Sequence, residues 1–239
     1  MTAITIDFWN TMVVAETNGS IRQEARLRQL EHVVESTGSA ISQNQLMAAY
    51  KRANERLDHL WQTEHLTPSV NRTLHLLWDD LELVVPEELH AETVRVFEEG
   101  LLVGPPDLAE GLPEAVETLA QHTQLGIISD TRFSPGRVIR LFLEERGLKR
   151  FFSGFVFSDE TGIAKPEEAA FERAADQLSS TPGALTHIGD IRRTDIAGAR
   201  RVGATGVLYT GIRTDTDTTP QTHHELSHWN ALPELLKRL

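Results

Sequence analysis

The chain has 239 residues, of which 40% are hydrophobic and 24% charged, as expected for a globular protein with one large domain or a domain carrying an inserted module. Its 35 acidic residues outnumber the 23 Lys and Arg residues, and the net charge of -12 argues against nucleic acid as a partner. It has no cysteine, which excludes disulfides and thiolate chemistry; because it also shows neither a signal-peptide pattern nor an apolar run of about 20 residues, we expect a cytoplasmic protein without a membrane partner.

The first predicted element is a strand that begins almost at the first residue and ends at Asp7. Such an apolar run is typical of a buried strand in a parallel sheet, whose ligands lie outside the carboxyl ends of the strands. Asp7 would therefore stand in the ligand crevice. Asn10 tolerates the left-handed backbone of a sharp exit loop, and the Thr11 hydroxyl could hold that loop or the carboxylate. A lone Asp at a strand end is more often a turn former, so this segment alone does not establish catalysis.

From about residue 20 to residue 102, apolar residues recur every three or four positions, as on amphipathic helices. No strand-like alternation of convincing length interrupts this pattern. We therefore predict an all-helical module that ends at the turn around Gly104-Pro105-Pro106. The residues that define the three helical stripes are Leu27, Leu30, Val33 and Val34; Leu46, Tyr50, Ala53, Leu57, Leu60 and Trp61; and Leu74, Leu77 and Leu81.

From Leu108 onward, short apolar strands alternate with amphipathic helices. This alternation predicts right-handed crossovers and a parallel, doubly wound sheet. The segment 215–220 is predicted to be a polar loop. The predicted strands are 124–128, 155–157, 185–188 and 206–209, and the predicted helices carry 115–119, 138–142, 167–178, 195–202 and 232–239.

Polar residues follow the predicted strands in a particular order. The first strand leads to Asp7 and Thr11, the second to Ser129-Asp130-Thr131, and the strand at 185–188 to Gly189-Asp190 with Asp195 five residues later; Lys165 lies between the last two groups. This set resembles the four motifs of the haloacid dehalogenase superfamily: Asp-x-x-x-Thr, a Ser or Thr, a Lys and Gly-Asp-x-x-x-x-Asp. The resemblance spans most of the chain.

The resemblance implies both a fold and a domain organisation. Residues 1–14 and 104–239 would form a Rossmann-like core with a doubly wound parallel sheet. Residues 15–103 would form an inserted all-helical cap of the C1 type, since they have its position, size and helical character.

The resemblance also implies a hydrolase that acts on a small phosphorylated substrate. Asp7 would attack phosphorus and form an aspartyl-phosphate that water then hydrolyses. Lys165 would neutralise charge shared by nucleophile and phosphate, while Ser129 would hold phosphate oxygens. Asp130 would lie beside the phosphate.

A magnesium ion is the cofactor that the resemblance implies. This ion prefers hard oxygen ligands and keeps several of its waters. The family's ligands match Asp7, the backbone carbonyl of Trp9 and Asp190, with Asp195 completing or supporting the set.

Two positions depart from the family pattern. Family phosphatases usually carry a second Asp two residues after the nucleophile as general acid and base, and here that position is Trp9. Indole cannot supply the proton, so we expect slow hydrolysis of poor leaving groups; the ring could stack on an aromatic substrate or fill the site. Asp130 stands where Asn is common and would repel phosphate unless it points away or pairs with Arg132.

These departures leave two alternatives open: a phosphate-binding relative with little or no activity, and a 2-haloacid dehalogenase. Dehalogenases of the superfamily carry an aromatic residue at the position of Trp9 but lack the Gly189-Asp190 motif. They also use a cap arginine. The candidates for this role are Arg22, Arg26 and Arg28. Their spacing indicates an ordinary solvated helix face.

The histidines are interpreted conservatively. His187 lies inside an apolar strand and is predicted to be a core residue. The group His223, His224, Glu225 and His228 has a metal-like composition but lies in a polar surface segment, so we do not expect a metal site there. The substrate and the oligomeric state are not determined by these patterns.

Overall fold

A computed structural model describes residues 3–222 and 224–237 of the protein. Its six strands form one sheet in the order β3-β2-β1-β4-β5-β6, and every neighbouring pair is parallel. This arrangement confirms the predicted doubly wound parallel sheet. The strands are β1 Ala3–Ile6, β2 Gln124–Ser129, β3 Gly154–Phe157, β4 Leu185–Gly189, β5 Thr205–Tyr209 and β6 Glu225–Leu226.

The position of β1 determines where the site lies. This strand pairs with β2 on one side and β4 on the other, so that Ile6 lies opposite both Ile127 and Ile188. The strand order reverses between β1 and β4, and the carboxyl side of such a switch point is where open α/β sheets bind their ligands. Asp7 is the first residue after β1.

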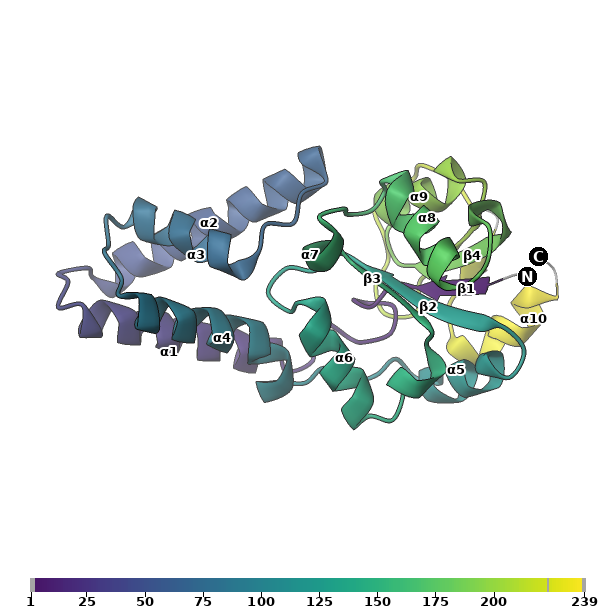
Figure 1. Ribbon diagram of the computed structural model, residues 1–239, viewed down its shortest axis with the longest axis horizontal. Helices are drawn as coiled ribbons and strands as arrows, with labels where there is room; N and C mark the ends of the chain where they lie inside the picture. Colours follow the sequence, from purple (N-terminus) through teal and green to yellow (C-terminus); the bar gives the residue numbers. More distant parts are fainter. Residues whose placement is uncertain (1–2, 223, 238–239) are drawn as a thin grey trace.

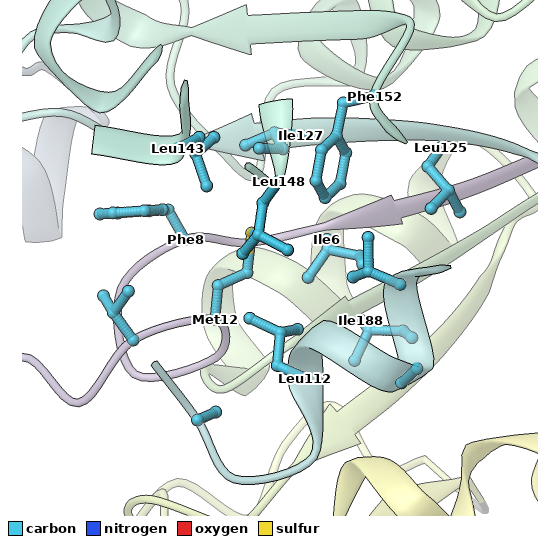
Figure 2. Packing of buried hydrophobic residues seen from close by; sticks show 14 of the residues in the cluster. Ile6, Phe8, Met12, Leu112, Leu125, Ile127, Leu143, Leu148, Phe152 and Ile188 are labelled. Carbon is cyan, nitrogen blue, oxygen red and sulfur yellow. The ribbon is translucent and has the colours of Figure 1, made fainter. Parts of the chain in front are cut away.

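Helices cover both faces of the sheet (Figure 1). On one face Ile6, Phe8 and Met12 pack with residues of α5, α6 and the C-terminal segment, as Figure 2 shows for part of this cluster. On the other face Ile128 packs with residues of α8 (Glu168–Gln177), among them Phe171, and of α9 (Ala197–Arg201). The helices are α5 Leu112–Ala120, α6 Gly136–Glu145, α7 Ser158–Thr161, α8 Glu168–Gln177, α9 Ala197–Arg201 and α10 Leu232–Leu236, with short turns η1 Lys149–Phe151, η2 Pro182–Ala184, η3 Arg192–Ile196 and η4 Trp229–Ala231.

A four-helix module lies at one end of the molecule (Figure 1) and has a hydrophobic cluster of its own, centred on Leu30, Leu74 and Phe97. Its helices are α1 Gly19–Ser36, α2 Gln43–Glu64, α3 Val70–Asp80 and α4 Glu87–Val103. Residues 15–103, all of them described, contain no strand, as their helical periodicity predicts. No helix in the described part of the chain is long and apolar enough to cross a membrane.

Three local features differ from the predictions. The helix expected from Asp195 begins three residues earlier as the π-helical turn η3, a wider turn of the kind often found at functional sites. Leu226, which lies in the short edge strand β6, is buried and pairs with Tyr209 of β5. We expected this segment to be polar surface. Helix α10 ends at Leu236, and the last two residues of the predicted helix 232–239 lie outside the described residues.

Candidate active site

A buried lysine joins two of the predicted carboxylates. Lys165 Nζ donates hydrogen bonds of 2.6 Å to Oδ1 of Asp7 and of 2.6 Å to Oδ1 of Asp195. Asp7 is brought there by the end of β1, since its backbone N–H donates to Ile188 and extends the β1–β4 ladder. All three ionisable side chains are at most 7% exposed. The structure thus brings together three predicted residues from distant parts of the sequence.

Asp195 has both carboxylate oxygens engaged by the protein. In addition to Lys165, Oδ1 lies 3.0 Å from His187 Nε2, while Oδ2 accepts from the Ile191 N–H at 2.9 Å. A Cβ at Gly189 would lie 2.2 Å from Asp195 Cγ, so the glycine of the Gly-Asp pair makes room for this carboxylate. His187 is completely buried as predicted, but its contact with Asp195 was not foreseen.

The charge distribution separates the carboxylates by their pKa values. Burial raises the pKa of Asp7 to about 7, against the attraction of Lys165. Burial, and then repulsion by Asp7 and Asp195, raises the pKa of Asp190 to about 8. For Asp195 burial is outweighed by Lys165 and His187, so its pKa is lowered. Burial likewise opposes the charge on Lys165, but its three acidic neighbours keep the pKa of the ammonium raised.

Asp190 is held at the end of β4 and is 2% exposed. Its Oδ2 atom lies 2.6 Å from Arg213 Nε, yet no donor among the described residues is directed at it with hydrogen-bond geometry. Arg213 lies in the segment after β5 and was not singled out from the sequence. Within the described ranges no cluster of three or more His, Asp or Glu side chains could hold a metal ion, so any metal here depends on two carboxylates and backbone oxygens.

Two predicted hydroxyls are buried without a hydrogen-bond partner. Ser129 Oγ at the end of β2 and Thr11 Oγ1 in the loop after β1 are both less than 2% exposed and have no partner among the described residues. Neither residue lines the cavity described below. Asn10 adopts the predicted left-handed conformation, with φ 53°.

Asp130 accepts hydrogen bonds both from the α/β part of the chain and from the four-helix module. Its Oδ1 atom accepts the backbone N–H of Lys165 at 2.9 Å, and Oδ2 accepts the indole N–H of Trp61, on α2, at 2.8 Å. Burial raises its pKa. The suggested pairing with Arg132 is wrong, because that guanidinium donates to Asp58 at 2.8 Å instead.

A cavity of about 330 Å³ lies between the sheet edge and the four-helix module. Its lining on the sheet side includes Asp7, Trp9 and Lys165, together with Asp130, Asp190, Asp195 and Arg213. The module contributes Trp61, Leu66 and several charged residues. The cavity is therefore enclosed by residues from both parts of the chain.

Trp9 is half-buried and packs edge to face against Phe8, with ring centroids 5.1 Å apart.

The interpretation of all three arginines as a solvated helix face is wrong for two of them. Arg22 is 6% exposed and donates to the backbone carbonyls of Thr17 at 2.9 Å and Gly104 at 2.5 Å. Arg26 is half-buried, and both residues line the cavity. Only Arg28 is exposed as expected. The sequence spacing indicates this burial, because Arg22 and Arg26 precede Leu30 and Val33 on the same apolar stripe of the helix.

The histidine-rich segment near the C-terminus is only partly at the surface: His224 is half-buried, whereas Glu225 and His228 are exposed. Glu225 pairs with Arg192 at 3.0 Å. His223 lies outside the described residues.

Comparison with known proteins gives one family match and several distant relatives. The model of a family described as haloacid dehalogenase-like hydrolase matches residues 1–203. The haloacid dehalogenase-like hydrolase domain-containing protein 3 of Danio rerio is 28% identical over 135 residues, which cover 55% of each protein. The glyceraldehyde 3-phosphate phosphatase of Methanopyrus kandleri is 32% identical over 93 residues, which cover 38% of this chain and 40% of that protein. The chain thus spans about half the length of the curated relatives that it matches, or less.

Solved structures share the whole fold at low identity. The 2-haloacid dehalogenase of Pseudomonas syringae pv. Tomato DC3000 has a TM-score of 0.73 and 23% identity, over 100% of this chain and 99% of that one. YfnB of Bacillus subtilis, described as a HAD-hydrolase and solved with magnesium bound, has a TM-score of 0.66 and 20% identity, over 98% of both chains.

Proposed function

The chain belongs to the haloacid dehalogenase-like hydrolases, whose family model matches residues 1–203, and we propose that it is a magnesium-dependent phosphatase that forms an aspartyl-phosphate at Asp7. The observation that carries this proposal is the buried Asp7–Lys165–Asp195 cluster at the base of the cavity. Phosphoryl transfer needs an in-line nucleophile and positive charge near the phosphate oxygens. Asp7 and Lys165 offer these two groups side by side.

In the first step, an Asp7 oxygen forms a bond to phosphorus, and the bond to the leaving oxygen breaks with its electron pair. Water then attacks phosphorus, which releases phosphate and regenerates the Asp7 carboxylate. Lys165 would stabilise the negative charge on both the nucleophile and the transferred group. The buried, unpartnered hydroxyl of Ser129 has hydrogen-bonding capacity to offer a phosphate oxygen after a small local movement.

The donor set on this chain fits magnesium. Asp7 and Asp190 are two buried carboxylates whose mutual repulsion, which raises the pKa of Asp190, a divalent cation would relieve. Asp190 Oδ2 pairs with Arg213 but accepts no hydrogen bond from the described residues. We propose that these two side chains and the Trp9 carbonyl would hold the ion, which retains several waters. When bound, magnesium supplies positive charge to the phosphate oxygens. Asp195 would support the set through Lys165, since protein donors already occupy its oxygens.

We further propose that residues 15–103 act as a cap on a core formed by residues 1–14 and 104–239. Hydrogen bonds join the two segments that connect these parts. Arg22 donates to the carbonyl of Thr17 in the first segment and to that of Gly104 in the second, and Asn18 donates to the Pro105 carbonyl at 2.8 Å. In the last turn of α2 the Trp61 indole N–H donates to Asp130 at 2.8 Å, and in the segment that follows Thr67 Oγ1 donates to Ser158 Oγ at 2.7 Å. The cap would thereby enclose the substrate over Asp7.

The proposal is tested by hydrolysis of acetyl phosphate and p-nitrophenyl phosphate with and without magnesium. We expect magnesium-dependent phosphate release that Asp7→Asn abolishes, while the exposed Asp176→Asn variant retains the parent rate. Binding of phosphate without turnover would indicate the non-catalytic alternative. Magnesium-independent chloride release from 2-chloropropionate would indicate a dehalogenase instead.

A further inference from the structure

We propose that Arg213 competes with magnesium for Asp190, so that the guanidinium and the metal ion are alternative partners of one carboxylate oxygen. Magnesium would then have to displace the Arg213 side chain before it could occupy its site. This inference rests on the magnesium site of the proposed function. It concerns a residue in the loop after β5, outside the four sequence motifs.

The contact between the two side chains is short but not strongly held. Arg213 Nε lies 2.6 Å from Oδ2 of Asp190, yet this oxygen accepts no hydrogen bond from the described residues. The Asp190 side chain is 3% exposed, whereas the Arg213 side chain is 43% exposed. An ion pair that lacks directed hydrogen bonds and has a half-exposed partner contributes little stability. Arg213 can therefore exchange for another cation at small cost, because the buried carboxylate keeps a positive partner.

Two cations cannot share this oxygen. Magnesium binds carboxylate oxygens at about 2.0–2.1 Å. A guanidinium nitrogen 2.6 Å from Asp190 Oδ2 would place its positive charge against a divalent ion on the same atom. Like charges repel strongly in a buried site, because few waters screen them. Occupation of Oδ2 by Arg213 and by magnesium is therefore mutually exclusive.

Arg213 is the movable cation of this cluster. Lys165 is 3% exposed, and Asp7 and Asp195 each accept a hydrogen bond of 2.6 Å from its ammonium, which fixes it in place. With Asp190 and these two carboxylates ionised, three negative charges face one ammonium, and Arg213 neutralises part of the excess. A divalent ion is attracted more strongly to the more negative cluster. Arg213 therefore lowers the magnesium affinity of the site.

The backbone on either side of Arg213 is held, so the exchange needs movement of the side chain alone. The Thr210 N–H donates to the Leu226 carbonyl at 2.9 Å, next to the pairing of β5 with β6. On the other side, Oδ2 of Asp215 accepts the backbone N–H of Arg192 at 2.6 Å. Since the Arg213 side chain is already half-exposed, displacement would move it farther into solvent.

The first measurement is magnesium binding by titration calorimetry at about pH 9, where the carboxyl groups of Asp7 and Asp190 are largely ionised. We expect Arg213→Gln to bind magnesium at least about fivefold more tightly than the parent, because it loses the competing charge. The control is Arg28→Gln, which makes the same change in net charge at a side chain that is 75% exposed. This variant should bind magnesium as the parent does.

The second measurement follows the Arg213 side chain by limited digestion with trypsin, which must bind an arginine side chain in order to cleave after it. In EDTA we expect slow cleavage between Arg213 and Thr214. Saturating magnesium should accelerate this cleavage by about threefold or more relative to the other tryptic sites, because it releases the side chain. Asp190→Asn removes the charged partner, so its cleavage should be fast in EDTA and should not respond to magnesium.

Magnesium binding by Arg213→Gln that is no tighter than in the parent would overturn the inference, and weaker binding would mean that Arg213 orients Asp190 for the ion. Cleavage after Arg213 that magnesium leaves unchanged or slows would overturn it as well. Failure of both the parent and Arg213→Gln to bind magnesium would instead reject the magnesium site of the proposed function, and the inference with it.

Discussion

Replacing Lys165 by methionine should destabilise the protein strongly, because it removes the charge that two buried carboxylates share. Methionine fills nearly the same volume, so the effect reports electrostatics and not a cavity. Lys165 is 3% exposed and lies 2.6 Å from an oxygen of Asp7 and of Asp195. Removing one partner of such a buried pair costs about 3–5 kcal/mol, and for a chain of this length that lowers the melting temperature by about 6–20 °C.

The loss should depend on pH in a specified direction. Lys165 lowers the pKa values of Asp7 and Asp195 in the folded protein. Without it, the folded-state pKa of Asp7 rises further above its unfolded value, and that of Asp195 rises from its lowered value. A carboxyl with a raised folded-state pKa loses stability as the pH increases through that value, and a carboxyl whose lowered folded-state pKa rises loses the stability that it contributed above its unfolded pKa. We therefore expect a larger loss at about pH 8 than at about pH 5.

The measurement is thermal unfolding followed by circular dichroism, in EDTA so that no metal compensates for the lost charge. Lys51→Met is the control, because Lys51 is 78% exposed and its ion-pair partner among the described residues is Glu55 on its own helix. A loss in Lys165→Met no larger than that of the control, or one independent of pH, would refute this account of the cluster.

Three further predictions concern the metal, the leaving group and the cap. The pKa values of metal-free Asp7 and Asp190 are raised to about 7 and about 8, and only ionised carboxylates bind magnesium. Calorimetry should therefore show that magnesium affinity increases from about pH 6 to about pH 8.5 and that binding releases protons. An Asp190→Asn variant that binds magnesium as tightly as the parent would contradict this site. Trp9→Asp should accelerate alkyl phosphate hydrolysis by about tenfold or more and hardly affect activated aryl phosphates, whereas equal rates for both substrates in the parent would mean that another group donates the proton. Trp61→Phe leaves the half-buried Asp130 carboxylate without its indole donor at a cost of about 1.5–3 kcal/mol, so hydrogen exchange in residues 54–68 should become faster than in the parent. Unchanged exchange would argue that this hydrogen bond does not hold the cap against the core.

The sheet and the main carboxylates were predictable because their signals are local. The apolar run that ends at Asp7, and the one that ends at Gly189-Asp190, each specify a buried strand with a polar residue at its carboxyl end. Parallel pairing then brings those ends together at one edge of the sheet. That Lys165 lies near Asp7 was expected from the family resemblance, whereas its contact with Asp195 is seen only in the structure.

The missing parts of the site depend on contacts between distant segments. Trp61 and Asp130 are 69 residues apart, and nothing near either residue indicates the other. Arg213 belongs to a loop, whose path is not encoded by periodicity. Arg22 and Arg26 were predictable from position, because they continue the apolar stripe of their helix.

The covalent intermediate at Asp7 is the central claim, and a quenched single turnover tests it most directly. The protein is mixed with acetyl phosphate and magnesium, stopped in acid within one turnover, digested and examined by mass spectrometry. We predict that the peptide containing Asp7 gains the mass of one phosphoryl group, and that Asp7→Asn shows no such gain. Phosphate release without any phosphorylated Asp7 peptide, or equal release by Asp7→Asn, would contradict the account.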